Sequence, residues 1–385
     1  MIRFTEENGA LIARSRNETI RIEGWGNNAL RVRTTLLKKL PDDAHALTED
    51  VAHSAKVTID EGSETAEIVN GKIKATVNGV GIICFYKDNE LILQEYYSYY
   101  YGSIRKEAIC YKIRSREYKG LASDDFKITV RFESDPKEKL FGMGQYQMPI
   151  LDLKGSVLPL EQRNSQVSVP FVVSSKGYGM LWNNPSTGEA AFGTNITKWI
   201  SDESDMVDYW ITADDTPAQI VTNYTECVGR APVMSKDYLG LWQCKLRYRT
   251  PDEVLEVARK YKELGIKLDV IVIDFFHWPH QGDWRFDEKY WSRDAVKAMT
   301  DELHAMGTKV MVSVWPSVDK RSENYYEMEQ KALISTTDVG SVQTYDYEGD
   351  CGTVDFFNPE AQEFVWSKCR QNYRDWGIDL FWLDN

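Results

Sequence analysis

The chain has 385 residues, of which 42% are hydrophobic and 27% charged, as in an ordinary globular protein large enough for two or three domains. Its formal net charge of −13 argues against a nucleic-acid partner, which would require a basic patch. No apolar run could span a bilayer, and no basic stretch followed by an apolar one begins the chain, so we expect neither membrane association nor a secretory signal.

The six cysteines are scattered and form no Cys-x-x-Cys pair. Without a signal, they are expected to be reduced thiols, and the protein is expected to be cytoplasmic. The 12 Trp and 21 Tyr are many for this length. Aromatic rings stack on sugars, although packing in a β-rich core accounts for most of them.

Up to about residue 230 the sequence is typical of β structure. Short segments of alternating polarity recur, and Asn-Gly and Asp-Asn turns separate them. The expected strands are 19–23, 57–60, 66–69, 72–77, 126–132 and 177–182. Many short strands joined by regular turns predict a β-sandwich domain, which we place at residues 1–235.

After about residue 236 the pattern changes to apolar strands that alternate with amphipathic helices. Thr250-Pro251 begins the first helix, with Thr as N-cap and Pro at the first helical position, and Gly265 ends it. The expected strands are 239–246, 268–273, 309–315 and 380–383, and the later expected helices are 294–306 and 358–376.

Apolar strands in such an alternation indicate a parallel sheet covered by helices on its faces. We therefore expect a (β/α)8 barrel domain at residues 236–385, incomplete and containing strands 1–4. A flat doubly wound sheet is the alternative, but no Gly-x-Gly-x-x-Gly follows the first strand.

The carboxyl ends of barrel strands carry the active site, and here two of them carry a carboxylate. Asp384 ends the fourth strand and fits the nucleophile of a retaining glycosidase, whose two carboxyl groups lie about 5 Å apart. Capping of a following helix is the competing interpretation. Asp274 ends the second strand and could be a catalytic acid, a ligand of sugar hydroxyls, or the partner of Lys245 or Arg247 in a salt bridge.

Aromatic and histidine side chains accompany these carboxylates. Trp315 ends the third strand and is either the wall of a sugar site or a core residue. His277 and His280 could join Asp274 and a further aspartate, Asp283, as metal ligands, but a His-x-x-His pair alone is weak evidence. We favour a pocket whose mouth is lined by His277 and Trp284.

Several of these runs together resemble glycoside hydrolase family 31, and most closely its α-xylosidase branch. The resemblance extends from about residue 141 to the end of the chain. It rests on FGMGQ (141–145), LDLKG (151–155), QRNSQ (162–166), GLWQCKLRY (240–248), DVIVIDFFHW (269–278), QGDWRF (281–286), MVSVWP (311–316) and FWLD (381–384).

The resemblance implies a β-sandwich packed on a barrel, and a retaining mechanism on α-linked sugars without metal or organic cofactor. It makes Asp384 the nucleophile and Asp274 the acid that holds hydroxyls of the bound sugar, with Trp315 lining the same subsite. Phe275 and Phe276 fall beside the C5 substituent, where bulk favours xylose.

The same resemblance implies that two further residues bind the substrate. Trp382 belongs to the motif that carries Asp384. Arg163, with Asn164, belongs to the loop 162–166, which from composition alone would be an ordinary exposed loop. The family brings this loop over the mouth of the barrel.

The family's general acid lies further along the chain than Asp384, so we expect the remaining barrel half as a continuation or as a second chain. The expected activity is release of α-linked xylose or glucose. The alternatives are an α-glucosidase or α-glucosyltransferase, and a non-catalytic carbohydrate-binding protein. The expected partner is a carbohydrate, and a homo-oligomer is left open.

Overall fold

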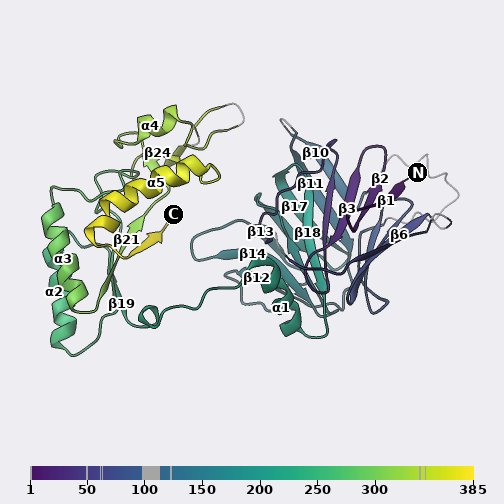
Figure 1. Ribbon diagram of the computed structural model, residues 1–385, viewed down its shortest axis with the longest axis horizontal. Coiled ribbons are helices and arrows are strands. Elements are labelled where there is room, and N and C mark those ends of the chain that lie inside the picture. The colour runs from purple at the N-terminus through teal and green to yellow at the C-terminus, as the bar shows by residue number, and fades with distance from the viewer. Residues whose placement is uncertain are drawn as a thin grey trace. The chain divides into compact units, whose positions relative to one another are not determined.

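The computed structural model describes residues 2–48, 51–60, 62, 64–97, 113–121, 124–337, 340–342 and 344–385. The chain divides into two compact units, Met1–Ala231 and Pro232–Asn385 (Figure 1). Each unit is described by itself. No helix among the described residues is long and apolar enough to cross a membrane.

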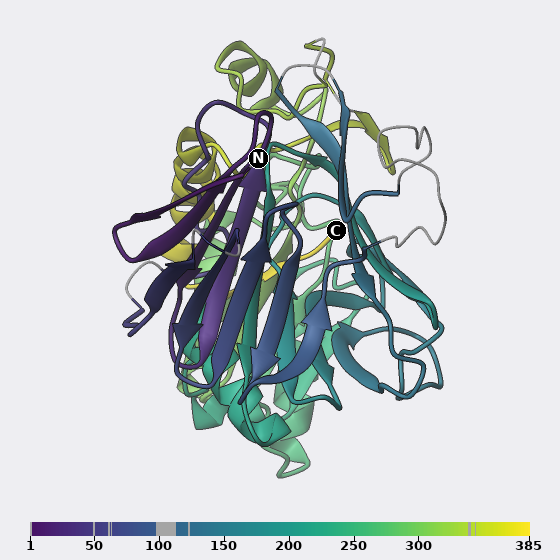
Figure 2. The ribbon, with the colours of Figure 1, turned by 90° about the vertical axis from the view of Figure 1, so that its right-hand side faces the viewer.

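The N-terminal unit is built from short antiparallel strands (Figure 2). They are β1 (Arg3–Glu7), β2 (Ala10–Arg14), β3 (Thr19–Gly24), β4 (Ala29–Thr35), β5 (Lys56–Asp60), β6 (Thr65–Asn70), β7 (Ile73–Asn78), β8 (Ile83–Lys87), β9 (Glu90–Gln94), β10 (Arg116–Gly120), β11 (Phe126–Glu133), β12 (Leu140–Gln145), β13 (Val157–Leu160), β14 (Val167–Ser174), β15 (Tyr178–Trp182), β16 (Gly188–Phe192), β17 (Ile196–Ser204) and β18 (Val207–Ala213).

These strands form a sandwich of two layers. One layer is an eight-stranded sheet in the order β1-β2-β3-β4-β18-β15-β14-β12. The other consists of two five-stranded sheets, β5-β6-β7-β8-β9 and β10-β11-β17-β16-β13, which meet at an antiparallel bridge between Glu95 and Phe132. One apolar core contains side chains from all three sheets, so the expected β-sandwich is confirmed.

The Asn-Gly turn signal between β6 and β7 forms the predicted hairpin. Asn70 pairs with Ile73 across the turn, and Gly71 takes a φ of 60°. A β-carbon on Gly71 would lie 2.1 Å from the side-chain oxygen of Asn28, so the turn needs glycine for both conformation and space.

A helix that the sequence did not reveal covers the outer face of the eight-stranded sheet. Helix α1 (Pro217–Val228) begins after Thr216, whose side chain accepts a hydrogen bond from the Gln219 amide. Ile220 packs with Phe171 and other residues that point away from the main core. The expectation of β structure up to residue 230 was wrong here, because the many strand signals around this segment outweighed the start signal of one helix.

The C-terminal unit contains a parallel sheet in the order β19-β20-β21-β25. Its elements are η2 (Lys236–Leu239), β19 (Trp242–Lys245), α2 (Pro251–Glu263), β20 (Val270–Ile273), α3 (Arg293–Ala305), β21 (Lys309–Val314), β22 (Ser317–Asp319), α4 (Tyr325–Gln330), β23 (Thr344–Asp346), β24 (Asp350–Thr353), α5 (Pro359–Asn372), η3 (Arg374–Trp376) and β25 (Leu380–Leu383). Strand order follows chain order, with a helix in each crossover, as in successive β/α units of a barrel.

Most of the predicted boundaries in this unit are close to the observed ones. Thr250 caps α2 by accepting from the Glu253 amide, and Pro251 is the first helical residue. The expected strand from residue 239 was too long at its start, because Leu239 still belongs to the short 3-10 helix η2. The small sheet β22-β24-β23 and helix α4 were missed, since strands this short give no alternation to read.

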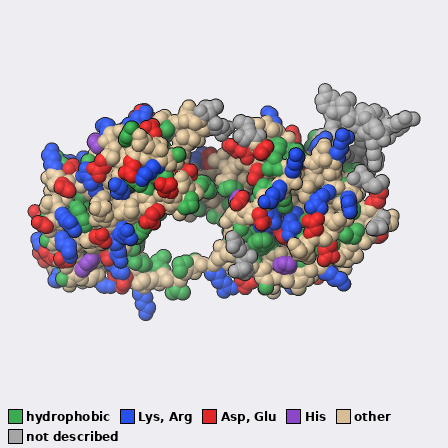
Figure 3. Space-filling model, turned by 45° about the horizontal axis from the view of Figure 1, so that its top comes forward, with side chains coloured by type: hydrophobic (Ala, Val, Ile, Leu, Met, Phe, Trp, Pro, Cys, Tyr) green, Lys and Arg blue, Asp and Glu red, His purple; other side chains and the backbone are tan. Residues whose placement is uncertain are grey.

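The two faces of the parallel sheet have different surroundings. Ile271, Ile273, Val310 and Val312 are fully buried beneath the helices. Residues in the alternate positions, with Val272 and Met311 among them, line a hollow of about 500 Å³ on the opposite face. On the molecular face in Figure 3, Lys and Arg are interspersed with Asp and Glu rather than gathered into a basic patch.

Candidate active site

Two carboxylates stand on one face of the parallel sheet, at its carboxyl edge. Asp274 comes two residues after Val272, and Asp384 two residues after Trp382, and both of those strand residues line the hollow. Because side chains alternate along a strand, both aspartates point to the face that carries the hollow. Strand order places β21 alone between their two strands.

Asp274 is 7% exposed and is held by two local donors. Its Oδ1 accepts a hydrogen bond from the Phe275 amide at 2.8 Å, and the Cys244 thiol donates to its Oδ2 at 3.7 Å. Burial raises the pKa of Asp274 above its ordinary value, and the negative charge of Asp384 raises it further. Burial and the Asp274 charge raise the pKa of Cys244 to about 11, so this thiol stays protonated.

Asp384 continues the ladder of its strand, since its amide donates to the Val314 carbonyl at 3.1 Å. Its side chain is half-buried. Within the described residues, no Lys, Arg or His forms an ion pair with either Asp274 or Asp384. A carboxylate without a cationic partner keeps its oxygens available for a substrate.

Aromatic rings lie beside the carboxylates, and we call this group, which includes Trp315 and Phe275, the aromatic wall. The Trp315 ring lies 5.0 Å from Phe275, 5.7 Å from Trp278 and 5.6 Å from Tyr347, measured between centroids. Trp315 is 8% exposed, and its buried indole Nε1 has no partner among the described residues. An unsatisfied donor at such a position is costly unless a ligand oxygen accepts from it.

Phe276 extends this wall toward the end of β19. Its backbone takes a φ of 68°, which turns the chain sharply after Asp274. Its ring centroid lies 4.2 Å from that of Phe275 and 4.7 Å from the guanidinium carbon of Arg247. The side-chain contacts therefore run from Trp315 through Phe275 and Phe276 to Arg247.

The structure buries His277 and Trp284, which we expected at a pocket mouth. His277 is 1% exposed, and its Nδ1 donates to the Asp274 carbonyl while its Nε2 accepts from the Tyr373 hydroxyl, each at 2.9 Å. Burial lowers the pKa of His277 to about 4, so the ring is neutral. Trp284 is 3% exposed, and its indole N–H donates to the Trp315 carbonyl at 3.1 Å. Both residues support the wall from behind, and direct sugar contact by either stays a prediction.

The other two predicted binding residues lie in different surroundings. Trp382 is 37% exposed and lines the same hollow as Cys244, below the carboxylates along β25. Arg163 lies in the N-terminal unit, in a turn closed by a bridge to Gln166, and its Nε is 3.6 Å from Glu161. Substrate binding by Trp382 and Arg163 stays a prediction.

No group of three or more His, Cys, Asp or Glu side chains that could hold a metal occurs among the residues that the structure describes. In the His277–Asp283 segment, both ring nitrogens of His277 are engaged by protein groups. Asp283 accepts from the backbone amides of His280 and Glu323. These hydrogen bonds give the segment a structural role.

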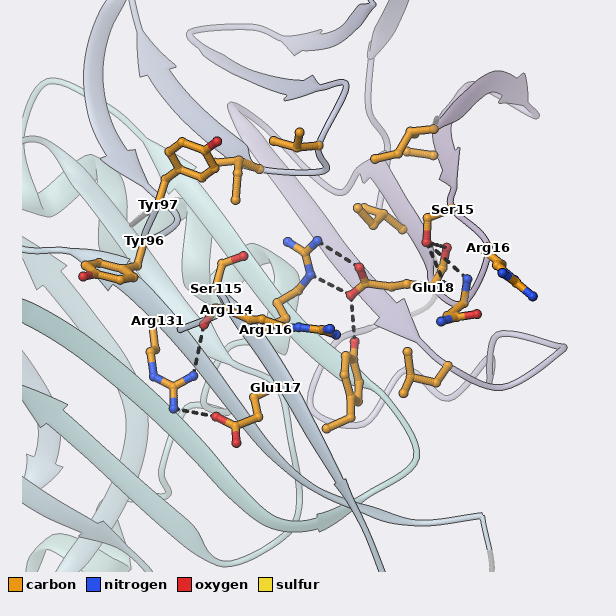
Figure 4. A pocket seen from close by; sticks show the side chains of 18 of the residues that line it. Ser15, Arg16, Glu18, Tyr96, Tyr97, Arg114, Ser115, Arg116, Glu117 and Arg131 are labelled. Atoms are coloured by element: carbon orange, nitrogen blue, oxygen red, sulfur yellow. Dashed lines mark hydrogen bonds and ion pairs between the residues drawn. The ribbon is translucent and has the colours of Figure 1, made fainter. Parts of the chain in front are cut away.

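A larger cavity, of about 950 Å³, lies in the N-terminal unit (Figure 4). Its charged groups are largely paired with one another: Arg116 with Glu18 at 2.8 Å, and Arg131 with Glu117 at 2.7 Å. The Tyr118 hydroxyl adds a hydrogen bond to Glu18. None of the predicted site residues lines this cavity, so we assign the candidate site to the C-terminal unit.

The sequence did not assign roles to Cys244, Trp278 or Tyr347. The strand-end rule brings Cys244 to the site, because it lies on the pocket-facing side of β19. Tyr347 carries no such signal, since it reaches Trp315 from the hairpin between β23 and β24, which the sequence did not predict.

Two carboxylates and an aromatic wall at the carboxyl edge of a β/α sheet, in a chain that also contains a β-sandwich, are typical of carbohydrate-active hydrolases. Residues 231–385 match the glycosyl hydrolases family 31 TIM-barrel domain, and residues 19–190 match the family's N-terminal galactose mutarotase-like domain. The chain belongs to glycosyl hydrolase family 31. The expected fold class, a β-sandwich followed by the start of a barrel, is thereby confirmed.

Relatives agree with this assignment. An uncharacterized family 31 glucosidase of Pseudescherichia vulneris is 44% identical over 100% of this chain and 74% of its own. α-Xylosidase A of Aspergillus niger is 31% identical over 95% of this chain and 52% of its own. A solved α-xylosidase from a soil metagenome, complexed with xylose, is 43% identical with a TM-score of 0.90 over 99% of this chain and 57% of its own. The chain thus spans about half to three quarters of these relatives.

Proposed function

We propose that the protein is a retaining α-glycosidase that releases terminal α-linked xylose. The observation that carries this proposal is the pair Asp274 and Asp384 on one face of the sheet, beside Trp315, whose indole N–H has no partner among the described residues. The α-xylosidases among its relatives support the sugar class. The rings of Phe275 and Phe276 support xylose in particular, because packed rings beside C5 leave little room for a hydroxymethyl group.

In the proposed mechanism, Asp384 attacks the anomeric carbon as the leaving oxygen is protonated by an acid that the family places after Asp384 in the chain. Water then hydrolyses the β-xylosyl ester and restores the α anomer. Asp274 accepts hydrogen bonds from sugar hydroxyls, and its charge stabilises them more than a neutral acceptor would. The Trp315 indole donates to a sugar oxygen.

An α-glucosidase is the second candidate, because the Pseudescherichia vulneris relative is described as a glucosidase. Rates on 4-nitrophenyl α-xyloside and α-glucoside separate the two. A kcat/KM ratio in favour of the xyloside supports the proposal, and a ratio in favour of the glucoside replaces it with the second candidate.

The nucleophile is tested with 5-fluoro-α-xylosyl fluoride, whose fluoride leaves without an acid. We expect a covalent adduct on the peptide that contains Asp384, detected by mass spectrometry after proteolysis. The matched control is Asp379→Asn, at the amino end of the same strand. The Asp379 carboxylate forms a hydrogen bond with His304 at 2.8 Å. Labelling elsewhere would contradict the assigned nucleophile. Absence of both labelling and turnover would favour a non-catalytic carbohydrate-binding protein.

A further inference from the structure

Arg247 carries a positive charge at the rim of the candidate site that no other described residue neutralises. It lies two residues beyond β19, at the same edge of the sheet as the two catalytic-site carboxylates. Its side chain is exposed, and within the described residues it forms neither an ion pair nor a hydrogen bond. Its one described side-chain interaction is with the Phe276 ring, 4.7 Å away.

This contact places the guanidinium beside the aromatic rings and leaves its donors unused among the described residues. A planar guanidinium that lies over a ring uses its face for the cation–π contact and leaves its N–H edges open. The ring itself is held by Phe275, which packs on Trp315. The guanidinium therefore lies against a ring that is itself packed, and a fork of donors of this shape matches a carboxylate in a bidentate pair.

We propose that Arg247 recognises a carboxylate on the leaving group of the substrate. This inference rests on the proposed function, in which Phe275 and Phe276 fill the space beside C5. Xylose carries no negative group, so a carboxylate that reaches Arg247 belongs to the leaving group. The preferred substrate class is an α-xyloside whose leaving group is acidic, such as a uronic acid or an aromatic acid.

The experiment compares two aryl xylosides of nearly equal shape, 3-carboxyphenyl and 3-carbamoylphenyl α-xyloside, with the intact enzyme. Arg247→Met keeps the apolar stem and removes the charge. We expect kcat/KM for the carboxylate to fall about tenfold or more in this variant, and the value for the amide to fall much less. Arg247→Lys keeps the positive charge but lacks the planar fork of donors, so its kcat/KM for the carboxylate should lie between those of the wild type and Arg247→Met.

Lys245→Met is the matched control. Lys245 is a neighbouring exposed cation, but its ammonium lies over Tyr248, which packs in the core on the helix-covered side, at 5.8 Å from the ring centroid. Its loss should leave the carboxylate-to-amide ratio unchanged. In the wild-type enzyme, 3-hydroxybenzoate should inhibit more strongly than 3-hydroxybenzamide, with an advantage that shrinks as salt rises.

The outcomes separate this inference from the proposed function. Turnover of both xylosides with the same ratio in wild type and Arg247→Met overturns the role of Arg247 alone. An equal fall for both substrates also overturns it, because it would mark Arg247 as a support of the fold or of another protein group. A wild-type enzyme that cleaves neither compound, nor any other α-xyloside, contradicts the proposed function and this inference together.

Discussion

Within the described residues, buried carboxylates of the sandwich form ion pairs, whereas one buried carboxylate of the β/α unit does not. In the sandwich, Arg31 and Asp208 are 1% and 0% exposed and form a pair at 2.6 Å, and Arg116 lies between Glu18 and Glu95. In the β/α unit, Asp274 is nearly as buried and has no cationic partner among the described residues. A buried charge without a partner destabilises the fold, so the unit that retains one does so for a reason other than stability.

The largest expected effect is the loss of activity on replacement of Asp384. Asp384→Asn should lower kcat on 4-nitrophenyl α-xyloside by at least about 10⁴-fold, because the nucleophile is lost. The melting temperature should be unchanged, since the carboxylate has no described ionic partner to lose. A large loss of stability in this variant would place Asp384 in the framework of the fold.

The second effect is the structural counterpart in the sandwich. Arg31→Met should lower the free energy of unfolding of the N-terminal unit by about 3–5 kcal/mol, because it leaves the Asp208 carboxylate buried without its partner. The double variant Arg31→Met/Asp208→Asn should recover part of that loss. Denaturant titration measures both, and a single variant as stable as the wild type would contradict the contrast.

The third effect joins activity and stability in one residue. Asp274→Asn should lower kcat/KM about 100-fold through loss of charged hydrogen bonds to the sugar. It should also raise the melting temperature at neutral pH. Since the folded-state pKa of Asp274 is raised, the folded protein binds its proton more tightly than the unfolded chain, and stability falls as pH rises through that pKa. Asparagine removes this penalty, so the gain should vanish at low pH.

The smallest effect tests the interaction between the two carboxylates. Xylose binding should weaken as pH falls, because protonated Asp274 no longer offers a charged acceptor. Burial is the main cause of the raised pKa of Asp274 and remains in Asp384→Asn, but the smaller contribution of the Asp384 charge is lost, so the weakening should begin at slightly lower pH than in the wild type. Calorimetric titration with xylose at a series of pH values measures this shift. Coincident profiles would show that the two groups do not interact.

The residues at the carboxyl edge of the parallel sheet could be predicted from the sequence, but the packing of the side chains around them could not. The strand-end rule found Asp274, Trp315 and Asp384, because apolar strands and parallel order are visible in the pattern. It could not find that the turn after β20 buries His277 under the wall, since that depends on the positive φ of Phe276.

Contacts between residues far apart in the chain were the other feature that the sequence did not predict. Tyr347 reaches Trp315 through a hairpin whose strands are too short to show a pattern. Helix α1 was missed although Thr216 and Pro217 form a recognisable start, because the surrounding β pattern outweighed one cap. The sequence thus determined the fold class, whereas the packing of individual side chains required the structure.

The pairing of β4 with β18 has a consequence for how the chain folds during synthesis. These neighbours in the middle of the eight-stranded sheet hold Arg31 and Asp208, which lie 177 positions apart. β4 and β18 cannot pair until the ribosome has released nearly the whole N-terminal unit. Until then one edge of β4 has no partner strand. The parallel strands of the second unit instead join in the order in which they emerge. The unpaired edge of β4 is therefore exposed to aggregation while the rest of the N-terminal unit is being synthesised.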